Sequence, residues 1–344
     1  MPRKRKSVTI KDIAEKAHVA YSTVSLVLNN KGYVSDKLKN RVLRIAKELR
    51  YQPNFVARGL ARRRLPIIAA VFPESPYFFA VSYFLRIIAG IQEVCKKTGN
   101  ALMLFNLNQT KGESYYQLSR KWLTDQIIII NVDYTRNIER DIRTLKENNI
   151  SFVFINKYLG KEDVSFICVD NYIGVYQAIE HLVSLGHSEI GLINGNLDTS
   201  DGRERFEAFK KVLREFKLKY NPNYVYPGRF SITGGKRAAL QFLKSKSRPT
   251  ALFAASDEIA INFMRILKTK GYFIPEQLSI VGFDDALEAS YITPSLTTVR
   301  QPLFQMGQRA AKLVIEQANK GFFKLQHISL KPRLIIREST AKKA

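Results

Sequence analysis

The sequence contains only two cysteines, Cys95 and Cys168, and both stand among apolar residues. Two separate thiols offer neither a disulfide framework nor the spacing of a metal site, so we expect a protein of the reducing cytoplasm. No segment approaches the roughly 18 consecutive apolar residues that a membrane-spanning helix needs. The basic opening stretch, MPRKRK, is not followed by an apolar signal core. We therefore expect neither secretion nor a membrane partner.

Signatures of common enzymes are missing as well. No Gly-x-Gly-x-x-Gly follows the first apolar run, and the chain has neither a Walker-type Gly-Lys-Ser/Thr nor a Gly-x-Ser-x-Gly sequence. The four histidines are scattered, and His187, in SLGHSEI, suits a packed or capping role. With no nucleophile–base pair and no metal-ligand set in view, we expect no enzyme activity, no cofactor and no metal. An unrecognised enzyme and a solute-binding protein stay open as alternatives.

Acidic residues are scarce at the N-terminal end. Residues 1–65 hold 17 lysines and arginines against 4 acidic residues, whereas the rest of the chain holds 38 against 26. About half of the net charge of +25 therefore falls in less than a fifth of the chain. This concentration favours a polyanionic partner such as nucleic acid. For the remainder of the chain, the alternative is a solvated surface that keeps the protein in solution.

Residues 1–50 predict a head that contains three short helices. The first begins after Thr9, with Asp12 in place of the usual Glu or Gln of a capping box. The second covers YSTVSLVLNN (21–30), and the third begins after Ser35, which is a good N-cap residue. Each helix carries one apolar stripe. We expect these stripes to form the core of the head: Ile10, Ile13, Ala14, Ala17, Val24, Val27, Leu28, Leu38, Val42, Ile45, Ala46 and Leu49.

Residues 51–65 predict a linker, because Pro53 ends the preceding helix and FVARGLA allows only a turn or two of a new one. Residues 66–344 predict an α/β core, in which short apolar runs alternate with helical patterns, as in parallel sheets covered on both faces. The expected strands are 67–72, 101–105, 127–132, 152–156, 190–195, 251–256 and 278–283, and the expected helices are 83–97, 113–123, 137–148, 172–185, 203–216, 234–245 and 258–270. So many strands indicate two doubly wound parallel-sheet lobes with a cleft at the carboxyl ends of the strands. We place lobe one at about 66–168 plus 297–330 and lobe two at about 169–296.

Six blocks of the sequence, in order, resemble the Lac repressor–galactose repressor family of bacterial transcription factors. The blocks are TIKDIAEKAHVAYSTVSLVLNN, VSDKLKNRVLRIAKELRYQPNFVARGLA, VDNYIGVYQAIEHLVSLGHSEIGLING, AASDEIAINFM, LSIVGFDD and PSLTTVRQP. The resemblance implies an all-α helix-turn-helix head and a core like that of periplasmic sugar-binding proteins. It also implies a sequence-specific transcriptional regulator, expected to be a repressor, that binds a pseudo-palindromic operator in double-stranded DNA. A homodimer is expected, with a tetramer left open, and a small molecule is expected to control it.

The resemblance assigns DNA contacts to the second helix, because the start of this helix reaches base edges in a helix-turn-helix. Tyr21, Ser22 and Leu26 are expected to read bases. Four polar residues are expected to contact phosphates: Thr9, Thr23, Ser25 and Asn29. The alternative is an ordinary amphipathic helix with a polar outer face.

Three positions of the head depart from the family pattern. His18 stands where the family usually has Gly, so it is expected to adopt the left-handed conformation that Gly takes easily. Ala20 replaces a capping Ser and supplies no side-chain oxygen. Leu26 stands where many members carry Arg. Arg can bond guanine O6 and N7, whereas Leu can only pack against apolar groups such as a thymine methyl. A different base preference at this position of the half-site is therefore expected.

The linker matches the family hinge that enters the minor groove, at Asn54, Ala57, Arg58 and Leu60. Leu60 matches the leucine that wedges between base pairs at the operator centre and bends the duplex. The alternative for Leu60 is a minor packing contact within the linker. The arginines of this segment should add salt-dependent attraction to phosphates.

Seven positions match those that line the family's effector cleft: Phe78, Phe79, Asn156, Arg205, Phe230, Ser256 and Asp284. Arg205 is expected to donate two parallel bonds to a diol or carboxylate, Asp284 to accept from hydroxyls, and Phe230 to stack on a sugar ring. The set suits a sugar or sugar derivative, while a purine, a nucleoside or a protein co-repressor stays open. As alternatives, Arg205 pairs with Glu204 or Glu207 on a helix surface, Asp284 belongs to a turn, and Phe230 belongs to the core.

Overall fold

The computed structural model describes residues 8–28, 32–51, 64–73, 82–107, 113–131, 138–157, 163–321 and 325–343. The chain forms two compact units, Met1–Leu65 and Pro66–Ala344. We describe each unit by itself, as the head and the core. Within the described ranges, no helix has both the length and the apolar character that crossing a membrane would require.

The head contains the three expected helices, α1 (Ile10–Ala17), α2 (Tyr21–Leu28) and α3 (Asp36–Glu48). Their apolar stripes meet in one small core, as predicted. Eight residues of these stripes are buried: Ile13, Ala14, Ala17, Val24, Val27, Val42, Ile45 and Ala46. Ile10, Leu28, Leu38 and Leu49 pack around them as partly buried neighbours. The spacing of apolar residues therefore fixes which face of each helix turns inward.

The ends of α1 show how the departures from the usual pattern are accommodated. The Asp12 carboxylate accepts from the Thr9 backbone N–H at 2.6 Å and from the Thr9 hydroxyl at 2.7 Å. His18 ends the helix in the left-handed conformation, with φ 51° and ψ 49°, as expected for a residue in place of Gly. Ser35 occupies the N-cap position of α3, but its side chain makes no capping bond.

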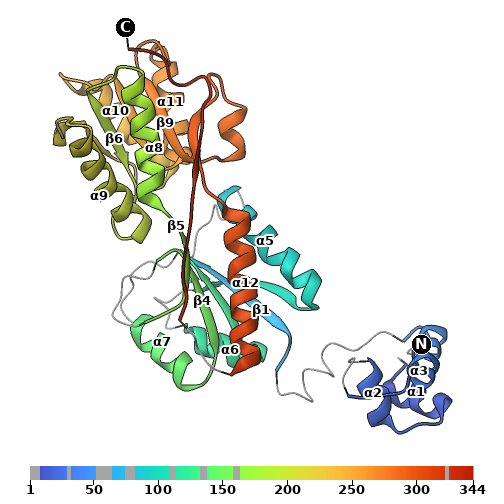
Figure 1. The fold of residues 1–344 in the computed structure, drawn as a ribbon. Helices are drawn as coiled ribbons and strands as arrows, with labels where there is room; N and C mark the ends of the chain where they lie inside the picture. The colour runs from blue at the N-terminus through green and yellow to red at the C-terminus, as the bar shows by residue number, and fades with distance from the viewer. Residues whose placement is uncertain are drawn as a thin grey trace, which may run out of the picture. The chain divides into compact units, whose positions relative to one another are not determined.

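The first lobe of the core is a parallel sheet with helices on both faces (Figure 1). Its strands are β1 (Ile67–Pro73), β2 (Ala101–Leu107), β3 (Gln126–Ile130), β4 (Ser151–Ile155), β5 (Phe166–Val169) and β11 (His327–Leu330), in the order β11-β5-β4-β3-β1-β2. Alternate residues of β1 point to opposite faces. Ile68, Ala70 and Phe72 pack under α5 (Ser82–Thr98) and α12 (Leu303–Lys320). Ala69 and Val71 pack under α6 (Tyr115–Trp122) and α7 (Ile138–Glu147).

Helices α5 and α12 lie side by side and approach each other at two glycines. A Cβ on Gly90 would lie 2.0 Å from the Phe304 carbonyl oxygen. A Cβ on Gly307 would lie 2.2 Å from the Ile87 carbonyl oxygen. The close approach of these two helix backbones therefore depends on glycine at both positions.

The second lobe repeats this architecture. Its strands are β6 (Ile190–Asn194), β7 (Val225–Pro227), β8 (Ala251–Ala254), β9 (Ser279–Asp284), β10 (Thr297–Arg300) and β12 (Arg333–Ile335), in the order β12-β10-β9-β8-β6-β7. Only the β10–β12 pair among the described strands is antiparallel. Helices α8 (Asn171–Ser184) and α9 (Ser200–Glu215) cover one face, and α10 (Ile232–Lys244) and α11 (Asp257–Thr269) cover the other. Every strand and helix expected in the core is present within a few residues of its predicted range.

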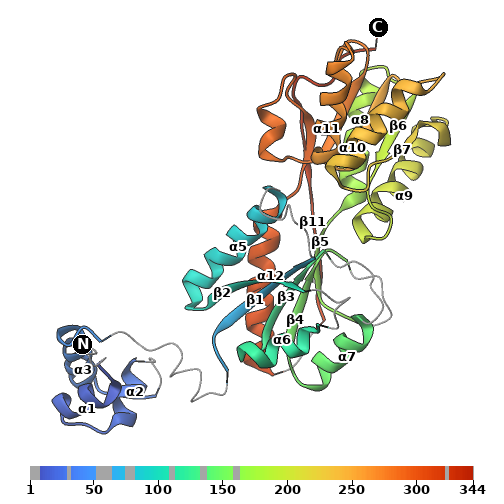
Figure 2. The ribbon, with the colours of Figure 1, turned by 180° about the vertical axis from the view of Figure 1, so that it is seen from behind.

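The chain passes between the lobes three times, from β5 to α8, from β10 to α12 and from β11 to β12 (Figure 2). The expectation that lobe one resumes at residue 297 was wrong, because β10 pairs with β9 in the second sheet. Lobe one instead resumes with α12, at Leu303. Five strands (β5, β7, β10, β11 and β12) and α12 were not predicted, since short strands owe their conformation to the neighbours they pair with.

The last residues of the chain pack on the second lobe. The buried Ser339 hydroxyl donates to the Ile280 carbonyl at 2.6 Å and accepts from the Thr297 N–H at 2.8 Å. His187 is buried beside this tail, with its ring nitrogens 3.0 Å from the Thr250 hydroxyl and 3.1 Å from the Ala341 carbonyl. Burial lowers the pKa of His187, so the neutral ring is favoured. The packed role expected for this histidine is confirmed.

Candidate DNA-binding head and effector pocket

Helix α2 has one buried face and one exposed face. Val24 and Val27 are buried, whereas Tyr21 is 64% exposed and Leu26 is 40% exposed. Ser22 is exposed as well, so the three residues expected to read bases are available at the surface of the head. A leucine that is this exposed adds little to the core of the head, and its side chain is accessible to a partner outside the head.

The flanking positions are placed as follows. Thr9 is exposed at the start of α1, and Thr23 and Ser25 are partly exposed on α2. The Leu26 side chain lies close to the backbone of Gly32, where an added Cβ would come within 3.4 Å of it. Asn29, the hinge positions Asn54, Ala57, Arg58 and Leu60, and the cleft positions Phe78 and Phe79 lie outside the described residues.

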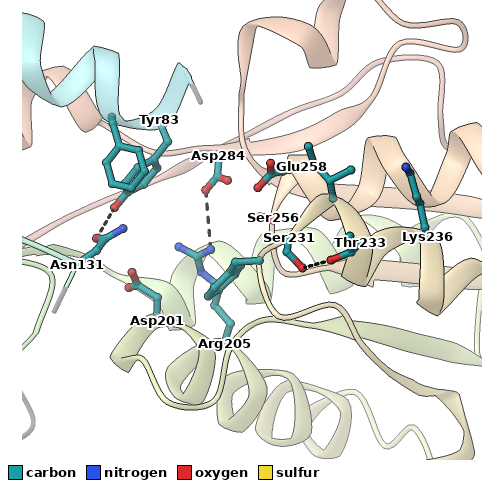
Figure 3. A pocket seen from close by; sticks show the side chains of 13 residues that line it. Tyr83, Asn131, Asp201, Arg205, Ser231, Thr233, Lys236, Ser256, Glu258 and Asp284 are labelled. Atoms are coloured by element: carbon teal, nitrogen blue, oxygen red, sulfur yellow. Dashed lines mark hydrogen bonds and ion pairs between the residues drawn. The ribbon is translucent and has the colours of Figure 1, made fainter. Parts of the chain in front are cut away.

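The core holds a pocket of about 440 Å³ whose walls come from both lobes (Figure 3). Four of the predicted effector residues line it: Arg205, Phe230, Ser256 and Asp284. They come from α9, from the loop before α10, from the turn before α11 and from the end of β9. The carboxyl ends of parallel strands thus bring together residues that are far apart in the sequence, as predicted for a doubly wound fold.

Arg205 is held rigidly inside this pocket and is only 2% exposed. Its Nε donates to the Asn171 side-chain oxygen at 2.8 Å, and its Nη1 donates to the Ala255 carbonyl at 2.6 Å. The guanidinium also stacks on Phe283, 3.8 Å from the ring centroid. Two of its three nitrogens are therefore occupied within the protein, which leaves Nη2 as the main donor for a ligand. The surface ion pair with Glu204 or Glu207 that we kept as an alternative is not formed.

Asp284 faces Arg205 across the pocket. Its Oδ1 accepts from the Gln301 amide at 2.6 Å and lies 3.8 Å from Arg205 Nη1. Burial raises the pKa of Asp284 to about 8, and the attraction to Arg205 offsets only part of this effect. The residue has φ 131°, a backbone conformation that is strained for any residue except glycine. Strain of this kind is typical of residues that are held in place for binding.

Phe230 and Ser256 owe their positions to local backbone geometry. The Phe230 ring lies over Gly195, where a Cβ would come within 2.2 Å of it, so glycine at the end of β6 makes room for the ring. Ser256 is the N-cap residue of α11, and its hydroxyl accepts from the Ile259 N–H at 3.4 Å. Both side chains line the pocket beside Arg205. Phe230 thus lies on the pocket wall and also packs against the core of the second lobe, and its stacking on a sugar ring stays a prediction.

The first lobe contributes a hydrogen-bonded group of three side chains, Tyr83, Asn131 and Asn156. Tyr83 and Asn131 line the pocket. Asn156, which we expected to line the cleft itself, lies buried behind them. Its amide nitrogen donates to Tyr83 Oη at 3.0 Å and to Asn131 Oδ1 at 2.5 Å. Asn156 therefore positions the two wall residues, because its donor group is already used.

Sequence reasoning missed the other nine wall residues. Tyr83, Phe84, Asn131, Asp201, Ser231, Ile232, Thr233, Lys236 and Glu258 also line the pocket. Asn131 directly follows β3, so the position of a polar residue after a buried strand was a usable signal. The residues of α10 carried no such signal, because a polar residue in the first turn of a helix is ordinary.

Polar contacts join the two lobes around the pocket. Lys157, which follows β4, pairs with Glu204 of α9 at 2.8 Å. Arg86 of α5 lies 4.0 Å from the Asp285 carboxylate in the second lobe. Nowhere in the described part of the chain do three or more His, Cys, Asp or Glu side chains gather as a metal ion would require.

The two units together define a class of protein: a DNA-binding regulator with a helix-turn-helix head and a core built to hold a small molecule. Comparison with known families agrees. Residues 9–54 match the model for bacterial regulatory proteins of the lacI family, and residues 179–340 match a periplasmic binding protein-like domain. The chain is 30% identical over 336 residues to the HTH-type transcriptional repressor PurR of Haemophilus influenzae (strain PittEE), covering 96% of this chain and 98% of that protein. The chain belongs to the lacI family of bacterial regulatory proteins.

Solved structures of the same kind support the fold over almost the entire chain. The Lac repressor dimer bound to operator and the anti-inducer ONPF is 26% identical, with a TM-score of 0.79 and coverage of 98% of this chain and 100% of that one. A complex of the transcriptional regulator CelR with cellobiose is 27% identical, with a TM-score of 0.73 and coverage of 96% and 99%. The family, the fold class and the role as a transcriptional regulator that we expected from the sequence are confirmed.

Proposed function

We propose that this protein is a transcriptional repressor that binds a pseudo-palindromic operator as a homodimer and changes its operator affinity when a small molecule occupies the core pocket. A sugar or sugar derivative is the favoured effector. A purine or nucleoside is the second candidate, because its flat ring would suit the same aromatic and amide groups. The protein acts on chromosomal DNA in the bacterial cytoplasm and carries out no chemical reaction.

One observation carries the effector part of this proposal. Arg205, Phe230 and Asp284 converge in a single pocket and supply a donor, an aromatic face and a carboxyl group. Directional hydrogen bonds around an apolar surface are what recognition of a hydroxylated ring requires. The cellobiose complex of the similar regulator CelR supports the choice of a sugar. The operator-bound Lac repressor dimer supports DNA binding as a dimer.

The head supports direct reading of bases. Tyr21, Ser22 and Leu26 lie on the exposed face of α2, where the residues of a recognition helix reach into the major groove. We propose that Thr9, Thr23, Ser25 and Asn29 contact phosphates and that Asn54, Ala57, Arg58 and Leu60 bind the minor groove. Leu60 acts there as a wedge between base pairs.

The proposed control works through closure of the two lobes. A ligand that contacts Tyr83 and Asn131 from one lobe, and Arg205 and Asp284 from the other, favours the arrangement in which both walls are in reach. The linker to the head enters the core at the first lobe, so a change between the lobes alters how two linkers of a dimer approach each other. Coupling of this kind is reciprocal, so a ligand that weakens operator binding must itself bind less tightly to the operator complex.

Two measurements test the proposal. Selection from a library of randomised duplexes should return a pseudo-palindrome, and Leu60→Ala should weaken binding to that site far more than binding to unrelated DNA. Equal losses on both kinds of DNA would remove the wedge from the proposal. A thermal-shift screen of sugars and nucleosides should then find a compound whose effect disappears with Asp284→Ala. If such a compound leaves operator affinity unchanged, the effector role of the pocket is refuted.

A further inference from the structure

Lys236 is a cationic residue in the wall of the effector pocket, and none of the contacts described above involves it. It lies in α10, lines the pocket and is partly buried. Throughout the described parts of the chain, its ammonium group forms no ion pair with an acidic side chain and donates no hydrogen bond. By contrast, Arg205 is held by Asn171, by the Ala255 carbonyl and by the nearby Asp284. Lys236 therefore presents an ammonium group at the pocket wall that is available to pair with an anionic ligand.

Two hydroxyl groups stand beside this lysine. Thr233 precedes Lys236 by three residues on α10, so the two side chains share one face of the helix. The hydroxyl of Ser231 lies 3.4 Å from that of Thr233, and all three side chains line the pocket. Figure 3 shows these three residues at one side of the pocket and Tyr83 and Asn131 at the other. The Ser231 hydroxyl caps α10, because it accepts from the Gly234 N–H at 3.0 Å, and it donates to the Gly228 carbonyl at 3.3 Å. The Lys236 ammonium and the Thr233 hydroxyl are therefore the donors suited to the oxygens of a phosphate or carboxylate.

The acidic side chains of the pocket do not prevent an anion from binding. Burial raises the pKa of Asp284 to about 8, so this group is mostly protonated at pH 7. Burial also raises the pKa of Asp201, whose carboxylate accepts from the Asn171 amide at 3.0 Å. The pKa of Glu258 is raised by burial and by the nearby Glu288. With Asp284 mostly protonated, the pocket is less negative than its count of carboxyl groups implies.

We propose that the effector is a polyhydroxylated molecule that carries a phosphate or a carboxylate, with Lys236 and Thr233 holding the anionic group. Arg205, Asn131 and Asp284 bind its hydroxyls at the other side of the pocket. The inference rests on the proposed function, because it takes this pocket to be the effector site. The volume of about 440 Å³ falls in the range that small-molecule sites occupy.

The test compares matched ligands on the full chain by isothermal titration calorimetry. The pairs are glucose with glucose 6-phosphate, glucose with gluconate, and ribose with ribose 5-phosphate, each titrated at low and at high salt. We expect at least one anionic member to bind about tenfold or more tightly than its neutral parent, and the preference to shrink at high salt. The phosphate and carboxylate pairs show which anion the site prefers. Inorganic phosphate should compete with the anionic member.

Two variants locate the effect. Lys236→Gln should abolish the preference for the anionic member, and Lys236→Arg should retain most of it. Lys244→Gln is the matched control, because Lys244 is exposed near the end of the same helix and outside the pocket. This variant should bind every ligand as the parent does.

Several outcomes would overturn the inference. Equal affinity for both members of every pair would do so, and so would a preference that survives in Lys236→Gln or a complete lack of binding. A neutral sugar whose binding depends on Asp284 but not on Lys236 would reject the anionic effector and leave the proposed function standing. Loss of the proposed function would appear separately, as failure to select an operator, since that assay contains no ligand.

Discussion

Asp284 and Asp285 are neighbours in the sequence, but their surroundings predict opposite consequences for the same substitution. Asp285 is buried, and its two carboxylate oxygens accept from Arg300 Nε at 2.5 Å and from Arg337 Nη2 at 2.6 Å. Arg86 of the other lobe lies 4.0 Å away. Asp284 instead faces the pocket. We predict that Asp285→Asn destabilises the core, whereas Asp284→Asn changes ligand binding and does not lower stability.

The magnitude follows from the exposure of the partners. Removing one member of a buried ion pair costs about 3–5 kcal/mol, because the remaining charges stay buried without compensation. The side chains of Arg300 and Arg86 are each 36% exposed and that of Arg337 is 17% exposed, so water can solvate part of the charge left behind. We therefore expect Asp285→Asn to lower the free energy of unfolding by about 2–4 kcal/mol. At pH 7 Asp284 is mostly protonated in the folded chain but ionised in the unfolded chain. An amide of the same shape removes the free-energy cost of that proton uptake, so it should raise the free energy of unfolding and not lower it.

Urea unfolding of the full chain at pH 7 measures both effects. Trp122 is the only tryptophan of the chain and lies in α6, so its fluorescence follows the first lobe, while circular dichroism follows the whole chain. Asp198→Asn is the matched control, because Asp198 pairs with Arg229 at the surface, where both side chains are more than half exposed. Its expected cost is below about 1 kcal/mol. The reasoning is refuted if Asp285→Asn costs no more than Asp198→Asn, or if Asp284→Asn costs as much as Asp285→Asn.

Three further predictions concern other parts of the molecule. Leu26→Arg should change the half-site returned by operator selection, toward guanine at one position, and identical half-sites from parent and variant would contradict the role of Leu26. Gly307→Ala should destabilise the first lobe in urea, although Ala normally favours a helix, because its Cβ would lie 2.2 Å from the Ile87 carbonyl oxygen; a stabilised variant would disprove the close packing of α5 and α12. Since burial raises the pKa of Asp284 to about 8 from an unfolded value near 4, its contribution to stability is complete below about pH 4 and is lost as the pH rises through about 8. Asp284→Asn should therefore lose less stability than the parent between pH 5 and pH 9, and parallel stability curves would contradict the raised pKa.

The fold could be predicted largely because its central strands are buried on both faces. A strand such as β3, QIIII, has a continuous apolar run, since both sides of the sheet are covered by helices. The head was predictable for a related reason, because three short helices can form a core only if each presents its stripe to the others. In both cases the pattern of buried residues can be recognised within one short segment of the sequence, so the partners that are distant in sequence need not be known.

The crossing segments could not be predicted in the same way. β10, TTVR, has only four residues, and the sheet it joins is decided by pairing with β9 and β12. The roles of site residues met the same limit. The sequence shows that Arg205 matches a position of the family's effector cleft. Only the structure shows that two of its nitrogens already donate, to the Ala255 carbonyl and to the Asn171 side chain. Asn156 was likewise expected on the pocket wall. The sequence does not show that its amide donates to Tyr83 and Asn131, because the three residues come from separate parts of the chain.

The position of the pocket bears directly on how a ligand could act. The chain crosses from β10 to α12 through Arg300 and Gln301, and these two residues contact Asp285 and Asp284 in turn. A ligand that engages Asp284 therefore competes with, or reinforces, a contact made by the segment that joins the lobes. The contact between Arg300 and Asp285 ties the start of this segment to the second lobe. In the mechanism proposed above, ligand binding and lobe movement act on the same covalent crossing, so their coupling needs no long path through the core.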